Sequence, residues 1–282
     1  RSGCPVHGGG TAVYQPFGTG ADLAYPLRVR CPIGGEVYPN AHFPDDGQGW
    51  LDNRPGSPTR GERYYFVGWF NHWFLLQMPN YIKTMAQIWF ITGEEVYAEK
   101  ARVLIERFAE VYPDIDSKDL TYDGTDWGVY VKLTGSFWEG GMLMRLMDGI
   151  ELLLPSFDDE FITVLHERIY RPAYEAYRAK PASGNWGNLW NPALARIGTF
   201  TGDSEILNFT LFEHPAAEVP TLDNQFMRDG FPFEASISYA STYHSVAAGV
   251  AAAMGENGHW VWEHPHLRES FNGFANLVCL DT

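Results

Sequence analysis

One short stretch, GNWGNLW at residues 184–190, combines two asparagines and two tryptophans with two glycines. Primary amides donate hydrogen bonds to carboxylates, and indole rings stack on sugar rings. Asn185 and Asn188 are therefore candidate ligands of an acidic substrate, and Trp186 and Trp190 are candidate walls of its subsite. Core packing is the commoner use of tryptophan and remains the alternative for both rings.

A second stretch, MRDGFPFEASISYASTYHS at residues 227–245, gathers acidic, basic and hydroxyl side chains. A tyrosine hydroxyl acts as general acid or base when neighbours lower its pKa from about 10. Tyr239 is the first candidate, and Tyr243 and His244 follow one helical turn later. Arg228 and Glu234 are candidate substrate contacts. The alternative is that the two tyrosines form an i, i+4 pair that packs one helix face.

A third stretch, TDWGVYVKLTGSFWEGG at residues 125–141, adds further aromatic and acidic side chains. Trp127 and Trp138 are candidate stacking platforms, and Glu139 is a candidate polar contact. The acids of the two stretches also offer a carboxylate pair for a glycoside hydrolase, whose two carboxyl groups lie about 5 to 9 Å apart. Helix capping or turn formation is the ordinary role of such acids. The acids concerned are Asp126, Glu139, Asp229 and Glu234.

Near the start of the chain, the sequences CPVHG and CPIGGE place cysteines in similar settings. Cys4, His7 and Cys31 can supply three ligands of a structural zinc site, which requires four protein ligands. By spacing, the fourth position falls on Gly34, which has no side chain to offer. Free cysteines in a loop-rich lobe are the alternative, because three cysteines do not make a disulfide framework.

Composition excludes some classes of protein. The formal net charge of −15 argues against general nucleic-acid binding, which needs a basic surface to displace counterions. No apolar run approaches the roughly 20 residues that span a bilayer, so no membrane partner is expected. The chain begins at Arg1 and ends in the apolar stretch FANLVCLDT, which suggests a piece of a longer protein.

The elements that must position these residues change character near residue 60. Residues 1–60 are rich in Gly, Pro, Asp and Asn and predict loops with short strands. Residues 61–282 predict an all-α domain, because apolar residues recur at helical spacing and helices are separated by turns that pair TG with an acid. This recurrence favours stacked helical hairpins, the unit of an α/α toroid. Helical patterns cover residues 64–93, with Pro79 as a break or kink, 94–113, 135–155, 158–180, 191–203, 241–256 and 264–280.

The E-x-S-x-x-Y run at Glu234, Ser236 and Tyr239, placed after DG and downstream of the NW segment at Asn185, resembles the heparinase II/III-like polysaccharide lyases. The N-terminal CP…CP…GEVYPN…FPDDGQGW pattern also resembles one branch of that group. The resemblance implies an incomplete (α/α) toroid followed by an antiparallel β-sandwich, which is missing from these 282 residues. It also implies cleavage of uronate-containing polysaccharides by β-elimination.

The resemblance further assigns roles. Asn185, helped by Asn188, would neutralise the uronate carboxylate, an oxyanion-hole role worth about 3 kcal/mol for one donor. Tyr239 would be the general acid and, in some geometries, the base. Many members carry His where Trp186 stands here, so Tyr239, His244 or another residue would have to take the proton. No organic cofactor is implied, and a polysaccharide substrate implies a secreted or periplasmic location.

The substrate and two other classes of function stay open. Basic side chains that could meet sulfate or carboxylate groups are scattered, so the particular anionic polysaccharide is not predicted. A glycoside hydrolase would produce saturated ends, whereas a lyase produces an unsaturated uronate. A non-catalytic sugar-binding domain would bind without turnover. The scattered basic residues are Lys132, Arg145, Arg196 and Arg228.

Overall fold

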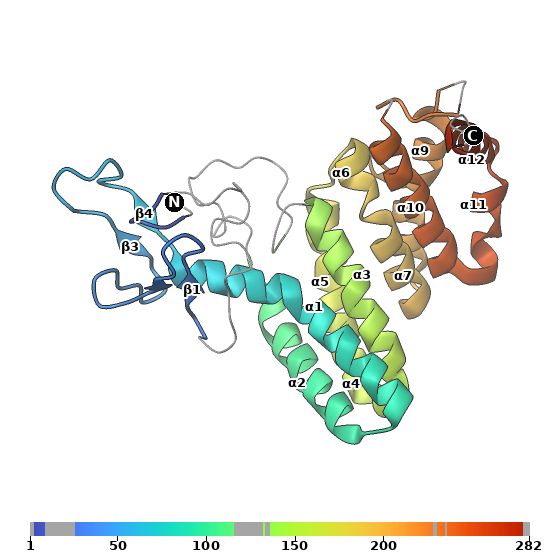
Figure 1. Cartoon of the computed structure of the whole chain (residues 1–282). Coiled ribbons are helices and arrows are strands. Elements are labelled where there is room, and N and C mark those ends of the chain that lie inside the picture. Colours follow the sequence, from blue (N-terminus) through green and yellow to red (C-terminus); the bar gives the residue numbers. More distant parts are fainter. Residues whose placement is uncertain are drawn as a thin grey trace. The chain divides into compact units, whose positions relative to one another are not determined.

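The computed structural model describes residues 3–8, 26–115, 132, 136–227, 230–234 and 236–278 (Figure 1). The described residues form two compact units, one extending to Met78 and the other beginning at Pro79. The boundary falls inside the first long helix. The predicted N-terminal segment 1–60 therefore lies within a unit that also contains the first half of this helix.

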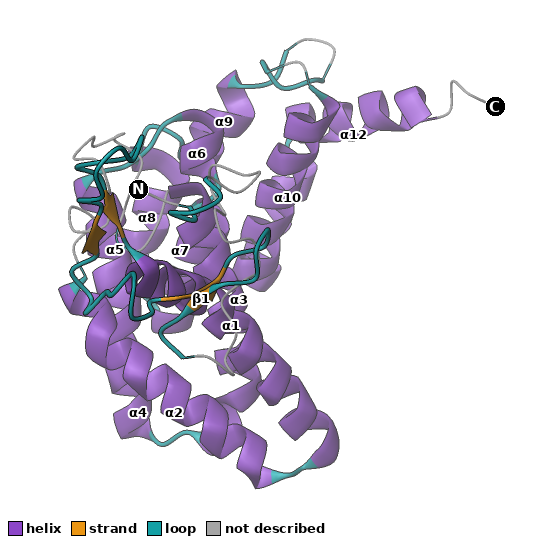
Figure 2. Ribbon diagram, turned by 60° about the vertical axis from the view of Figure 1, so that its left-hand side comes forward, coloured by secondary structure: helices purple, strands orange, loops and turns teal. Residues whose placement is uncertain are grey.

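Short strands occur in the N-terminal unit, as its Gly- and Pro-rich sequence predicts (Figure 2). β1 (Val29–Arg30) pairs antiparallel with β2 (Val37–Tyr38), with Val29 opposite Tyr38. β3 (Trp50–Leu51) pairs antiparallel with β4 (Arg63–Tyr64), with Trp50 opposite Tyr64. Such short ladders provide little stability, so side chains must hold this unit together.

The core of this unit is aromatic. Tyr38 stacks on Phe66 with ring centroids 4.8 Å apart, and Cys4 and Cys31 are buried in the same cluster. A buried carboxylate organises the loop between β3 and β4, because Asp52 accepts hydrogen bonds from Arg54, Ser57 and Thr59. The Arg54 guanidinium and the two hydroxyls hold the pKa of Asp52 well below its usual range.

The first long helix, α1 (Phe66–Thr92), begins at a cap supplied from an earlier loop. Asp45 Oδ2 accepts from the backbone N–H groups of Phe66 and Val67 at 2.8 and 3.1 Å, which satisfies two donors of the first turn. The helix continues through Pro79 without a break. It ends at Gly93, whose φ of +71° is the left-handed conformation that glycine tolerates at this position.

The second unit is almost entirely helical. After α1 come α2 (Glu95–Val111), α3 (Ser136–Leu153), α4 (Asp159–Leu165), α5 (Arg171–Ala179), α6 (Gly184–Asn188), α7 (Asn191–Thr201) and α8 (Ser204–Asn208). The chain continues with α9 (Glu218–Asn224), α10 (Ile237–Met254), α11 (His259–Glu263) and α12 (Pro265–Val278). Short 3-10 turns occupy 112–114, 154–156 and 255–258, and π-helical turns occupy 166–170 and 209–213.

Helices α7 and α10 lie side by side at the centre of the C-terminal half of this unit (Figure 1). Their close approach requires a small residue, because a Cβ on Gly249 would lie 2.8 Å from the Pro192 ring. Around them, the core includes Ala195 of α7, Leu222 of α9, and Tyr243 and Val250 of α10. This packing fixes the start of α10, where the candidate tyrosine lies.

The prediction of a mostly helical chain is confirmed, and the described part of residues 1–60 contains only short strands and turns. The repeated turn plan is also seen, since Gly202 follows α7 with a φ of +67° and Asp203 caps α8 through its side chain. Pro79 does not break its helix, because the apolar pattern on both sides outweighs the loss of one backbone hydrogen bond. Within the described residues, no helix combines the length and apolar character needed to cross a membrane.

Candidate active site beside α6 and α10

The GNWGNLW stretch folds into the short helix α6 and leads directly into α7. Its two glycines have different purposes. Gly184 begins the helix with a φ of +59°, a left-handed conformation that favours glycine. Gly187 is packed tightly, because an added Cβ would lie 2.2 Å from the Ala182 carbonyl oxygen and 2.6 Å from the Ala216 methyl group. The two glycines thereby fix the position of Asn185 and Trp186 between them.

Asn185 and Glu234 meet across the fold. Asn185 Nδ2 donates to Glu234 Oε2 at 3.3 Å, which links α6 to the segment that precedes α10. Both side chains remain accessible to solvent. Trp186, next to Asn185, exposes 42% of its surface. An amide, a carboxylate and an indole ring are therefore presented at the surface around α6.

Tyr239 lies in the first turn of α10 and exposes 46% of its surface. The turn is anchored by its next residue, since Ala240 is fully buried and its N–H donates to the Ser236 carbonyl at 2.8 Å. Helix α10 also contacts α6. Glu234, which accepts from Asn185 of α6, and the exposed Tyr239 thus lie in one short segment that leads into α10.

Tyr243 and His244 lie one turn further along α10 and are buried, which corrects their expected catalytic role. Tyr243 packs edge to face on Phe226, and burial, with a smaller contribution from the Glu234 charge, raises its pKa to about 12. His244 Nε2 pairs with Ser270 Oγ at 2.6 Å, and burial lowers its pKa below the ordinary value. These side chains support the helix that carries Tyr239.

Three other predicted substrate contacts belong to the core and are corrected here. Trp190 is fully buried and stacks on Tyr177 with centroids 4.7 Å apart, so its ring cannot line a sugar subsite. Asn188 is also fully buried, which removes it from a substrate carboxylate, and among the described residues its amide has no hydrogen-bond partner. Glu139 is buried and accepts from Tyr112 Oη and from the Lys132 backbone N–H, which fixes it inside the helical unit.

The remaining predicted residues are placed as follows. Trp138, on α3, exposes 42% of its surface, and its role as a stacking platform stays a prediction. Trp127 and Arg228 lie outside the described residues, as do Asp126 and Asp229. Glu234 is the one member of the proposed carboxylate pair that the structure both describes and exposes.

Two of the scattered basic residues, Arg196 and Lys132, are engaged inside the helical unit. Arg196 forms ion pairs with Asp148 and Glu151. Lys132 donates from Nζ to the carbonyls of Pro113 and Ile115 at 2.9 and 2.8 Å. These cations are therefore structural in the described conformation, and they do not form a basic surface for sulfate groups.

Sequence reasoning did not identify a buried polar network directly beneath α6. His214 Nε2 donates to Asn191 Oδ1 at 2.9 Å, and Asn191 Nδ2 donates to Glu218 Oε2 at 3.0 Å. Tyr177 Oη donates to the Gly187 carbonyl at 3.0 Å, which ties the same region to α6. Burial lowers the pKa of His214 to about 4 and raises the pKa of Glu218 to about 7, the latter opposed by the Asn191 amide. No spacing in the sequence distinguishes these residues from ordinary helix ends.

A groove of about 540 Å³ lies elsewhere in the helical unit, along α2 and α4. Its basic residues already have partners. Arg102 contacts Glu106 and Asp158, and Arg168 donates to the backbone carbonyls of Ala109 and Glu110. None of the predicted site residues lines this groove, so it is not the candidate active site.

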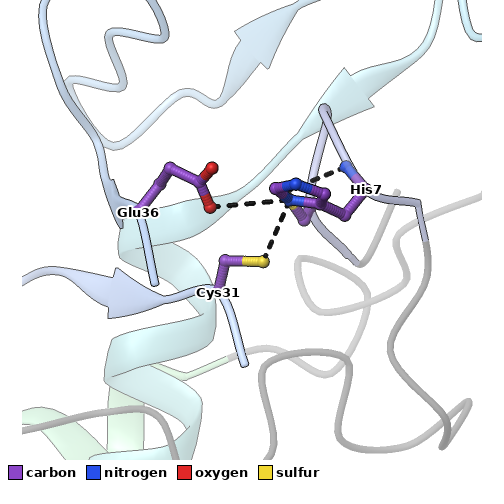
Figure 3. A group of neighbouring side chains, drawn as sticks. His7, Cys31 and Glu36 are labelled. Carbon is purple, nitrogen blue, oxygen red and sulfur yellow. Dashed lines mark hydrogen bonds and ion pairs between the residues drawn. The ribbon is translucent and has the colours of Figure 1, made fainter. Parts of the chain in front are cut away.

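The N-terminal unit contains a second cluster with chemical potential. Cys4, His7, Cys31 and Glu36 place one ligand atom each within 4.8 Å of one another. Figure 3 shows His7, Cys31 and Glu36 turned toward a common point. Burial raises the pKa of Cys4, but hydrogen bonds from Tyr38 and from backbone N–H groups outweigh it and leave the pKa below its usual value. Burial raises the pKa of Cys31. Glu36 is an addition to the three residues that the sequence predicted.

Neither a scan against protein-family models nor a search of curated proteins gave a match to this chain. The function is therefore inferred from the geometry of the side chains.

Proposed function

We propose that this chain is a polysaccharide lyase that cleaves uronate-containing polysaccharide by β-elimination, with its helical unit forming an incomplete (α/α) toroid. One observation carries the proposal. The Asn185 amide already donates to a carboxylate, that of Glu234, and the exposed Tyr239 follows Glu234 closely in the chain, at the start of α10. A side chain that binds one carboxylate in this position is suited to bind another.

The chemistry requires these residue types. The C5 proton of a uronate is poorly acidic while the adjacent carboxylate carries its full charge. A donor on that carboxylate stabilises the enolate-like intermediate by the same principle as an oxyanion hole. The base then takes the C5 proton, the C5 electron pair forms the C4–C5 double bond, and the C4–O bond breaks. In this proposal, Asn185 binds the substrate carboxylate, and Tyr239 donates its hydroxyl proton to the departing oxygen.

Glu234 takes a specific part in the proposal. Its carboxylate lies on the Asn185 amide where the substrate carboxylate would lie, so substrate must displace or share this contact. The contact holds the amide in position before substrate arrives. Once substrate is bound, its carboxylate and that of Glu234 repel each other. Trp186 and Trp138 would supply exposed indole faces for sugar rings.

The experiment that tests the proposal is an ultraviolet absorbance assay for new conjugated double bonds, run on a panel of uronate polysaccharides. Tyr239→Phe keeps the ring and removes the proton, so it should lower kcat by about 100-fold or more. Asn185→Ala should lower it by about 100- to 1,000-fold. Tyr97→Phe, a partly exposed tyrosine on α2, is the matched control and should retain full activity.

The outcomes separate the remaining functions. Full activity in Tyr239→Phe would refute the assigned proton transfer. New saturated reducing ends without absorbance would indicate hydrolysis. Binding without any product would indicate a sugar-binding domain, and such binding would persist in Tyr239→Phe. A secreted or periplasmic location accompanies the lyase proposal, because large polysaccharides are met outside the cytoplasm.

A further inference from the structure

We propose that Cys4, His7, Cys31 and Glu36 form a four-ligand zinc site that holds the N-terminal unit together. This site is independent of the proposed lyase activity. Zinc is bound in proteins by thiolate, imidazole and carboxylate groups, and a site with four protein ligands is structural because no position is left for a substrate.

The two cysteines lie in turns of matching geometry. Gly8 N–H donates to the Cys4 carbonyl and Gly35 N–H donates to the Cys31 carbonyl, each at 2.9 Å. In both turns the backbone N–H three residues on also donates to the sulfur, from His7 to Cys4 and from Gly34 to Cys31 at 3.4 Å. Backbone donors on both sulfurs stabilise the thiolate form, which is the form that binds metal.

The spacing of the ligand atoms fits a metal better than it fits hydrogen bonds. His7 Nδ1 lies 3.5 Å from Cys4 Sγ, 3.5 Å from Cys31 Sγ and 3.5 Å from Glu36 Oε2. A single ring nitrogen carries at most one proton and cannot form good hydrogen bonds with three groups at once. Around tetrahedral zinc, with Zn–S near 2.3 Å and Zn–N near 2.0 Å, sulfur and nitrogen ligands lie about 3.5 Å apart.

Glu36 supplies the ligand that spacing alone assigned to Gly34. Its Oε2 atom is buried, and among the described residues it has no hydrogen-bond partner. Gly34 leaves the space that this carboxylate needs, because a Cβ there would lie 2.2 Å from both Glu36 Oε2 and the His7 ring. The lack of a side chain at Gly34 thus makes room for the Glu36 carboxylate to lie beside the other three ligands.

The site connects segments that the short strands hold only weakly. It would join the turn at Cys4 to the β1–β2 hairpin, and both cysteine residues are at least 98% buried. Cys4 Sγ also lies 3.2 Å from Tyr38 Oη, which links the cluster to the aromatic core of the unit. Because metal affinity then contributes to folding, removal of zinc should destabilise this unit.

Metal analysis of the freshly purified full chain is the first test, and about one zinc per chain is expected. Glu36→Gln should weaken zinc binding by at least about 10-fold, and His7→Gln should do the same. His42→Gln is the matched control, because His42 is an exposed histidine of the same unit and should leave zinc binding unchanged. Chelation should lower the Tm, and added zinc should restore it.

A measurement on the unaltered chain avoids variants that fail to fold. Cobalt substitution should give the intense visible absorption of a tetrahedral thiolate site. Less than a tenth of a zinc per chain, combined with a Tm that does not respond to zinc, would overturn the proposal. A Cys4–Cys31 disulfide detected by mass spectrometry in the freshly purified chain would overturn it as well.

Discussion

Asn185 Nδ2 and Glu234 Oε2 lie 3.3 Å apart although their residues are 49 positions apart in the chain. The contact joins the short helix α6 to the segment before α10, and both side chains stay accessible to solvent. An amide held on an exposed carboxylate can exchange that partner for a carboxylate of the substrate. Glu234 is therefore the residue whose removal distinguishes competition with substrate from a direct substrate contact.

Glu234→Gln should lower KM for an anionic polysaccharide about 5-fold and leave kcat nearly unchanged. The reason is the loss of one like charge beside the bound carboxylate, worth about 1 kcal/mol in a solvent-exposed setting. Initial rates across substrate concentrations measure both constants. Glu256→Gln, which changes an exposed acid beyond the other end of α10, should alter neither. A KM that rises in Glu234→Gln would mean that Glu234 binds substrate directly.

The helices were predictable because their signals are local. Apolar residues at helical spacing, the glycines after α1 and α7, and the acids that follow them are all readable within one window of sequence. The aspartate that caps α1 was not predictable, since Asp45 lies 21 positions before the backbone N–H of Phe66 that it binds. Capping across such a distance depends on the path of the intervening loop.

The candidate site was predictable in residue type and only partly in exposure. Trp186 and Trp190 look alike in the sequence, yet one is half exposed and the other fully buried, because a short helix and its exit turn direct them to opposite environments. Likewise, spacing pointed to Gly34 as the fourth zinc position. In the proposed zinc site, Glu36, two residues later, takes that position, and Gly34 leaves space for its carboxylate.

The two tryptophans should respond differently to truncation. Trp190→Ala should lower the free energy of unfolding by about 3 to 5 kcal/mol, because it removes a fully buried ring stacked on Tyr177. Trp186→Ala should change it by less than about 1 kcal/mol and should weaken polysaccharide binding. Urea unfolding and binding isotherms measure the two effects. Equal losses of stability would show that the Trp186 ring is needed for packing.

Alanine at two glycines should have opposite effects on stability. Gly187→Ala should destabilise the protein by about 1 to 3 kcal/mol, because the new methyl group would overlap the Ala182 carbonyl and the Ala216 side chain. Gly141→Ala, within α3, should stabilise it by about 0.5 to 1 kcal/mol, since its Cβ would make only an ordinary contact with Arg145 at 3.5 Å. Thermal unfolding of the two variants checks both signs. A neutral Gly187→Ala would mean that α6 shifts to make room.

The buried pair of His214 and Glu218 should make stability depend on pH in two opposing ways. Asn191 bridges the two side chains, and both carry shifted pKa values. The pKa of Glu218 rises from 4.5 to about 7 on folding. Between these values the unfolded chain has lost a proton that the folded chain retains, so stability falls as pH rises, by about 3 kcal/mol in total.

His214 acts in the other direction, because its pKa falls from 6.5 to about 4 on folding. Between these values the unfolded chain binds a proton that the folded chain lacks, so stability rises with pH. In the pH range where both side chains contribute, their effects on stability oppose each other. The stability of the unaltered protein should therefore be nearly independent of pH in that range. Glu218→Gln removes the contribution of Glu218, which lowers stability as pH rises, and keeps that of His214. The free energy of unfolding of this variant should therefore rise between pH 4 and 6.5. His214→Gln should instead show stability falling between pH 4.5 and 7.

Urea unfolding at half-unit pH steps measures these slopes. Glu263→Gln, an exposed acid on α11, is the matched control and should follow the unaltered protein. If Glu218→Gln also followed the unaltered protein, Glu218 would be ionised in the folded state despite its burial. The Asn191 amide would then be a stronger partner for the carboxylate than one hydrogen bond of ordinary strength, and the buried network beside α6 would hold a charge.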